Sequence, residues 1–126
     1  MIPQTMIDVK ISVEQLIYQI NYYDKPTARS FIKQMPFTVT LEDYAGMEKI
    51  FYPQQALSKA KAPDGAQPRM GDLMYYAPWG DVALFYKDFR FANGLIPLGK
   101  VEDIDGLMDA LKLASFQATF EINQIQ

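Results

Sequence analysis

The sequence predicts a mainly β protein, a closed eight-stranded barrel with two short capping α-helices. Several segments alternate apolar and polar residues, as half-buried strands do. The stretches 70–76 and 81–87 are apolar at almost every position and flank a turn at residues 78–80, which is typical of a hairpin buried on both faces. Two further segments carry apolar residues at helical spacing.

The remaining strands follow from alternation along the chain. They are expected at residues 5–12, 16–22, 37–42, 48–52, 95–100 and 116–122. The first two should form a hairpin that turns near residues 13–15. Because Pro97 cannot donate a ladder hydrogen bond, strand 95–100 is expected at an edge of the sheet or with a bulge.

Two helices are predicted, over residues 26–35 and 103–111, because apolar residues recur at i, i+3, i+4 and i+7 in both. Asp24 is a plausible N-cap of the first helix and Pro26 suits its first turn. Pro36 should end it, because a residue before proline disfavours helical backbone.

Two segments are expected to be loops. Residues 53–69 are polar and interrupted by prolines, and residues 88–94 form an aromatic loop that carries Phe89 and Phe91. A connection as long as 53–69 inside a compact domain is often functional or mobile.

Composition limits the chemistry. The 126 residues suit one domain, 1–126, and the chain has no Cys and no His. Disulfides and thiolate chemistry are therefore excluded, and the usual catalytic triads and most zinc and haem sites lose their commonest residue. We expect no metal and no cofactor. Glu102, Asp103, Asp105 and Asp109 look like a solvated helix face and lack the spacing of a calcium loop.

Charge and hydropathy exclude two classes of partner. The net charge is −3, and the one organised basic group is the row Lys25, Arg29 and Lys33, which is too small for a nucleic-acid surface. No stretch approaches the length needed to cross a bilayer. The first residues lack a positive region ahead of an apolar run, so we expect no signal peptide and a cytoplasmic protein.

Three segments carry a resemblance to a known family. They are residues 24–29 (DKPTAR) at a helix entry, the strands 71–76 (GDLMYY) and 84–87 (LFYK), and residues 98–101 (LGKV) followed by a helix with Asp-Gly-Leu. In this order they resemble the cyclophilin-like fold, in particular its compact bacterial and archaeal members of unassigned function.

The resemblance bears on activity as well as fold. True cyclophilins isomerise peptidyl-prolyl bonds in a groove on the side of the barrel, where an Arg from a Phe-His-Arg strand acts near the prolyl nitrogen. The counterpart here, residues 48–51, reads Glu-Lys-Ile-Phe, and Lys49 cannot reproduce the planar fork of a guanidinium. We therefore expect a cleft without a guanidinium and assign no catalytic residue. At most one groove aromatic, Phe85 or Tyr86, carries over.

The leading functional interpretation is a binding module for a small molecule or peptide. Its groove is expected between the hairpin 70–87, the loop 53–69 and the aromatic loop 88–94. The candidate ligand-binding residues are Arg29, Phe51, Tyr76, Trp79, Phe85, Tyr86, Phe89 and Phe91.

Each candidate also has a structural interpretation. Phe85 and Tyr86 point to opposite faces of a strand and are more often core residues than a ligand wall. Trp79 either packs on a neighbouring loop or marks a binding or dimer surface. Arg29 is expected to be a solvated or paired charge, and Asp72 to bond backbone in a turn.

Two other function classes stay open. One is an enzyme, either a residual prolyl isomerase or an unrelated activity that uses Tyr, Asp and Arg. The other is a homodimer whose aromatic rim is only an interface.

Overall fold

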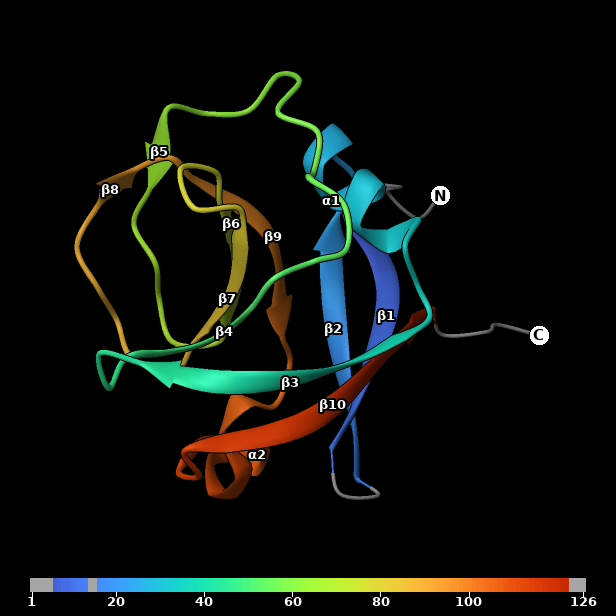
Figure 1. Cartoon of the computed structure of the whole chain (residues 1–126), viewed down its shortest axis with the longest axis vertical. Coiled ribbons are helices and arrows are strands. Elements are labelled where there is room, and N and C mark those ends of the chain that lie inside the picture. Colours follow the sequence, from blue (N-terminus) through green and yellow to red (C-terminus); the bar gives the residue numbers. More distant parts are fainter. Residues whose placement is uncertain (1–5, 14–15, 123–126) are drawn as a thin grey trace.

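Eight antiparallel strands close into one barrel in the computed structural model (Figure 1), which describes residues 6–13 and 16–122. The order around the barrel is β1-β10-β3-β4-β7-β6-β9-β2. The strands are β1 (Met6–Val13), β2 (Leu16–Tyr23), β3 (Phe37–Tyr44), β4 (Glu48–Phe51), β6 (Asp72–Tyr76), β7 (Asp81–Phe85), β9 (Leu95–Val101) and β10 (Ser115–Ile122). The predicted fold class and all eight predicted strands are confirmed.

Pro97 sits at a bulge and not at an edge. Strand β9 pairs with both β2 and β6, so it has a neighbour on each side. Its register against β6 shifts between Leu73, opposite Gly99, and Met74, opposite Pro97. The extra residue in β9 accommodates a proline inside a closed barrel. The predicted turn at residues 13–15 falls partly outside the described residues, as do residues 1–5.

Aromatic rings fill one end of the barrel. Phe31 from α1 (Pro26–Ile32) is fully buried, and its ring lies 5.5–6.1 Å from those of Phe37, Phe51 and Phe120. Tyr22 stacks on the same ring at 5.7 Å. Such contacts add about 0.5–1.5 kcal/mol per pair beyond the burial of apolar area. Helix α1 is therefore held in place by its aromatic side chain.

The first helix is shorter than predicted. It ends at Ile32, after which the backbone N–H of Met35 donates to the carbonyl of Ile32 at 3.0 Å, a tight turn ahead of Pro36. Lys25 occupies the N-cap position without a side-chain cap. Asp24 does not cap the helix, because its carboxylate pairs with Arg29.

Helix α2 (Ile104–Leu111) lies at the opposite end of the barrel from α1 (Figure 1) and buries Leu107 and Leu111. Asp103 is its N-cap, and its carboxylate accepts a hydrogen bond from the backbone N–H of Gly106 at 3.0 Å. A Cβ at position 106 would lie 2.3 Å from that carboxylate. Glycine therefore leaves room for the cap.

A second, two-stranded sheet joins the two segments expected to be loops. Strand β5 (Gly65–Ala66) pairs with β8 (Ala92–Asn93) beside the barrel (Figure 1). A Cβ on Gly65 would lie 2.4 Å from the carbonyl oxygen of Ala92, so the pairing requires close backbone approach. The expectation of plain loops is corrected here, because strands of two residues leave no periodic pattern.

The 70–87 hairpin is apolar because it packs on both faces. Leu73, Tyr75, Val82 and Leu84 belong to the barrel core. Met74, Ala83, Phe85 and Leu95 form a separate buried cluster on the outer face.

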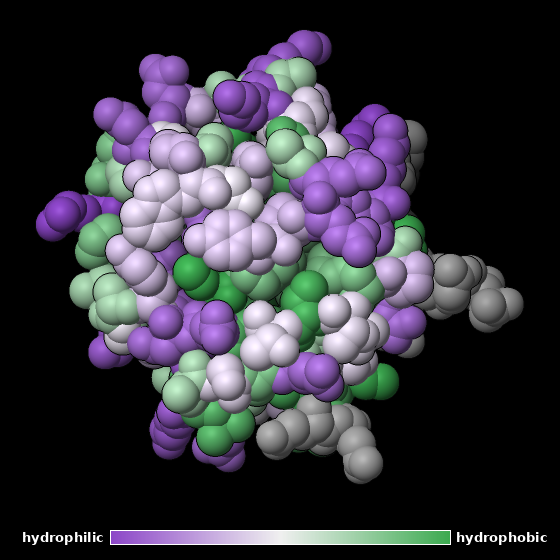
Figure 2. Space-filling model, in the orientation of Figure 1, coloured by the Kyte–Doolittle hydropathy of each residue, from purple (hydrophilic) through white to green (hydrophobic). Residues whose placement is uncertain are grey.

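In Figure 2 the face turned to the reader mixes hydrophilic and hydrophobic residues. No helix in residues 6–13 and 16–122 is both long and apolar enough to span a membrane.

Candidate functional site

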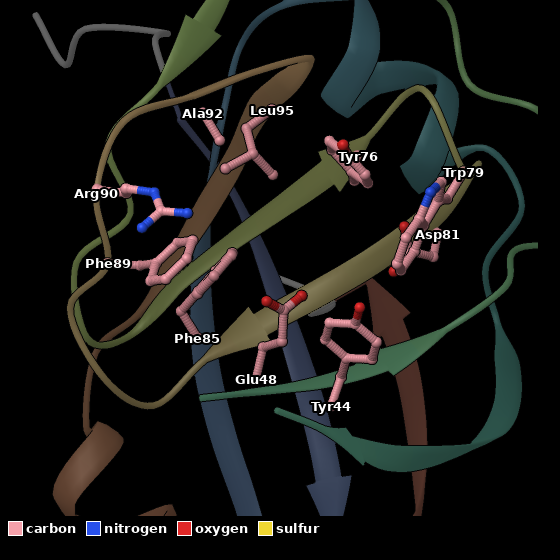
Figure 3. Close-up of a pocket in the computed structure, with 10 residues that line it drawn as sticks. All are labelled: Tyr44, Glu48, Tyr76, Trp79, Asp81, Phe85, Phe89, Arg90, Ala92 and Leu95. Carbon is pink, nitrogen blue, oxygen red and sulfur yellow. The ribbon is translucent and has the colours of Figure 1, made fainter. Parts of the chain in front are cut away.

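A pocket of about 280 Å³ opens on the outer face of the barrel (Figure 3). Strands β4, β6, β7 and β9 form its floor, and the segment between β7 and β8 folds back along one side. Its lining residues are Tyr44, Glu48, Tyr76, Trp79, Asp81, Phe85, Phe89, Arg90, Ala92 and Leu95. Phe85 and Leu95 are buried in the outer cluster, so the apolar floor is preformed.

Three aromatic rings stand at one end of this pocket. The Trp79 ring meets Tyr44 edge-on at 5.3 Å between centroids and 84°, and Tyr76 at 5.5 Å and 72°. Trp79 nevertheless remains 51% exposed at the tip of the hairpin. We call these three residues the aromatic corner. Trp79 therefore packs on two neighbouring tyrosines and also lines the pocket.

Two carboxylates lie beside the aromatic corner. Asp81 is only 1% exposed, and its Oδ1 has no hydrogen-bond partner in the described part of the chain. Glu48 is half-buried on β4, and Figure 3 shows its carboxylate between Phe85 and Tyr44. Its side chain makes no hydrogen bond or ion pair with another described residue. Two acids without a counter-ion thus share one small pocket.

Their surroundings favour the protonated forms. Burial and, to a smaller extent, the nearby carboxylates of Asp81 and Asp43 together raise the pKa of Glu48 to about 7. Burial also raises the pKa of Asp81, opposed by a hydrogen bond from its own backbone N–H. Raised carboxyl pKa values in a cleft are a common mark of functional sites.

Arg90 brings a guanidinium to the opposite end of the pocket. It lies over the Phe89 ring at 5.1 Å (Figure 3). The loop is held over the outer face because the backbone N–H of Phe89 donates to the carbonyl of Pro68 at 3.0 Å and Met70 donates to Asp88 at 2.7 Å. The expectation of a cleft without a guanidinium is therefore wrong, since folding of the 88–94 loop delivers one from outside strand 48–51.

The structure brings together four of the eight candidate residues. Tyr76, Trp79, Phe85 and Phe89 line the pocket. The loop 53–69, expected as a third wall, contributes no lining residue; strand β5 within it packs against the same outer cluster through Ala66.

Three other candidates lie away from it. Phe51 points into the barrel and is 4% exposed, so it belongs to the core. Phe91 is 56% exposed and faces Gly65. Arg29 on α1 pairs with Asp24, as expected for a charge with a structural role.

Tyr86 belongs to a different cluster at the α2 end of the barrel. As strand alternation requires, it points to the opposite face from Phe85. Its hydroxyl donates to Asp43, whose Oδ1 also lies 3.2 Å from the Nζ of Lys49. Lys49 is 1% exposed and donates to the carbonyl of Leu113. The lysine nearest the expected catalytic position thus joins β4 to the end of α2 and points away from the pocket.

Sequence reasoning missed Tyr44, Glu48, Asp81 and Arg90. The alternation of side chains along a strand could have indicated two of them, Asp81 and Glu48. Asp81 is four residues before Phe85 on β7, and Glu48 pairs directly with Phe85 across β4 and β7, so all three share the outer face. Arg90 and Tyr44 depend on how the 88–94 loop and the β3–β4 turn fold back, which no local pattern indicates.

A wider hollow of about 530 Å³ lies between the start of α1 and residues 60–63. Its charged residues, Lys25 and Lys61, are both exposed. Among its described lining residues none carries a buried side-chain atom without a hydrogen-bond partner, in contrast to Asp81 in the pocket on β4 and β7. In the described ranges no cluster of His, Cys, Asp and Glu could hold a metal ion.

A model of the cyclophilin-like family matches residues 11–121. The chain belongs to this family. The described barrel fits that assignment, as does its likeness to a hypothetical protein from Archaeoglobus fulgidus known by its solution structure. The two share a TM-score of 0.71 and 18% sequence identity, over 94% of this chain and 96% of that chain, so they have the same fold. A comparison with curated proteins gave no match.

Proposed function

We propose that this cyclophilin-like domain is a binding module that takes a small molecule, or one side chain of a peptide, into the pocket on β4, β6, β7 and β9. The observation that carries the proposal is the pairing of a preformed apolar floor with a buried carboxylate, Asp81, whose Oδ1 has no hydrogen-bond partner among the described residues. Binding sites commonly combine apolar walls with a few placed polar groups.

The size of the pocket limits its occupant. A volume of about 280 Å³ is at the lower end of the range for ligand pockets, about 300–1,000 Å³. A single aliphatic or aromatic group fits this space, whereas a dinucleotide does not. The half-exposed Trp79 offers the occupant a large rigid contact surface at the rim.

A fragment screen by ligand-observed NMR tests the proposal. We expect fragments that bind the wild-type domain to lose about tenfold or more in affinity with Trp79→Ala. Phe91→Ala is the matched control, because Phe91 is equally exposed and comes from the adjoining loop but does not line the pocket. The proposal fails if no fragment binds, or if both variants weaken binding equally.

A residual prolyl isomerase is the second candidate, favoured by the guanidinium of Arg90 in the same pocket as Phe85. Isomerisation of a model prolyl peptide, followed with wild type and Arg90→Lys, separates the two functions. The binding-module proposal expects no acceleration by either protein. Acceleration that the lysine variant abolishes would establish the enzyme instead, because lysine keeps the charge and loses the planar fork.

A further inference from the structure

The aromatic corner and the two carboxylates together describe the chemistry of an occupant. From this we infer that the ligand presents an alkylammonium group, which enters between Tyr44, Tyr76 and Trp79 and lies against Asp81 and Glu48. The inference rests on the proposed function and names the class of ligand for that same pocket.

The aromatic corner suits a cation. Its three rings come from three places in the chain, the end of β3, the end of β6 and the hairpin tip, and are nearly perpendicular where they meet. Trp79 and Tyr44 stay 51% and 42% exposed, so they are not buried for the sake of the core. The electron-rich faces of Trp and Tyr rings attract ammonium groups within about 6 Å of the ring centroid.

The Asp81 carboxylate provides an independent reason. It is almost completely buried, yet its Oδ1 accepts no hydrogen bond from any described residue. A buried carboxylate oxygen without a partner is costly, and one that stays so in a native structure needs an explanation. An ammonium supplies both N–H donors and the opposite charge. A quaternary ammonium supplies only the charge, so the geometry favours an ammonium with N–H groups.

No cation among the described residues already fills this role. Lys49 is engaged at the other end of the barrel by Asp43 and the carbonyl of Leu113. Arg90 lies over Phe89, across the pocket from Trp79 and Asp81 in Figure 3. Within the described residues, the acidic end of the pocket therefore lacks a counter-ion.

Protonation should be coupled to binding. The groups around Glu48 are Asp81 on β7, Asp43 on β3 with the Tyr86 hydroxyl bound to it, and Arg90 at the far end of the pocket. Burial and the two carboxylates hold the pKa of Glu48 at about 7, and an ammonium in the pocket would lower it. Binding should therefore release protons near neutral pH, and affinity should rise with pH through that range.

The test is a calorimetric titration of the intact domain with n-butylammonium chloride, and with pentan-1-ol and pentanoate as neutral and anionic probes of similar size. We expect n-butylammonium to bind at least about tenfold more tightly than pentan-1-ol, and pentanoate not to bind. The affinity for n-butylammonium should fall several-fold from pH 8 to pH 5.5, a range in which the alkylammonium itself stays charged.

Variants assign the effect to the pocket. Asp81→Asn and Glu48→Gln should each weaken n-butylammonium binding by about tenfold. Trp79→Phe tests the same site should the Asp81 variant fail to fold, and Glu42→Gln, an exposed carboxylate on β3, is the matched control that should bind as wild type does.

The outcomes separate the two proposals. Equal or tighter binding of pentan-1-ol or pentanoate in the pocket would overturn the ammonium inference and leave the binding module standing. Binding of n-butylammonium that survives both acid substitutions would also overturn it. If neither these probes nor the fragments of the wider screen bind, the proposed function fails as well.

Discussion

Glu48 is a carboxyl group held where its charged form is disfavoured. Its pKa in the folded protein, about 7, is above the ordinary value of 4.5. The folded state therefore binds the proton more tightly than the unfolded chain does. The stability from this group is fully present below about pH 4.5 and is lost as pH rises through 7.

Glu48→Gln should remove this pH dependence. We expect the variant to be more stable than wild type by about 1–2 kcal/mol at pH 8, after allowance for partial exposure, with the difference vanishing near pH 4.5. Urea unfolding at several pH values measures it, with Glu42→Gln as the control. A difference that stays constant from pH 5 to pH 8 would show that Glu48 is not held protonated.

The alternation of inward and outward side chains on β4 explains why Phe51 was expected to line the groove. Lys49 and Phe51 point into the barrel, while Glu48 and Ile50 face outward. A lysine in a strand normally indicates the solvent side, so parity read from the sequence places Phe51 outside with it. The inward Lys49 is possible only because Asp43, Tyr86 and the Leu113 carbonyl meet its charge, and that arrangement depends on distant segments.

At the scale of elements, Lys49 fastens β4 to the end of α2. Lys49→Met keeps most of the apolar stem and removes the donor, which leaves the Leu113 carbonyl and Asp43 without their partner. We expect a loss of about 1–3 kcal/mol in the free energy of unfolding. Lys112→Met is the matched control, because Lys112 is 74% exposed and its contact with Asp109 is 3.9 Å long. It should change stability by no more than about 0.5 kcal/mol.

An equal effect of the two lysine variants would contradict this assignment of Lys49. Hydrogen exchange adds a local readout, since loss of the Lys49 bond should increase exchange in α2 and in the residues just after it more than in α1.

The long strands and both helices could be predicted because each repeats a pattern over seven or more residues or carries a strong terminal signal. Strands β5 and β8 could not, because two residues carry no period and their pairing requires the close approach of Gly65 to Ala92. The same small sheet anchors the loop that carries Arg90. The part of the site on β6 and β7 could therefore be predicted from the sequence, whereas the part that the loops contribute could not.

At the scale of the whole molecule, the barrel closes on itself and carries a second buried cluster on part of its outer face. Strands β4, β7, β6 and β9 carry an apolar cluster there, and Ala66 of β5, Phe89 and Ala92 of β8 pack against it. The uncovered part is the pocket with the aromatic corner. A homodimer that uses Trp79 as an interface remains a prediction in competition with a ligand at the same place.

A crystal structure of the domain grown with a bound fragment tests the central claim most directly. We predict electron density for the fragment between Trp79 and Phe85, with a polar atom of the fragment directed at Asp81. Density instead in the hollow between α1 and residues 60–63, or a second copy of the chain seated over Trp79 with the fragment bound elsewhere, would contradict it.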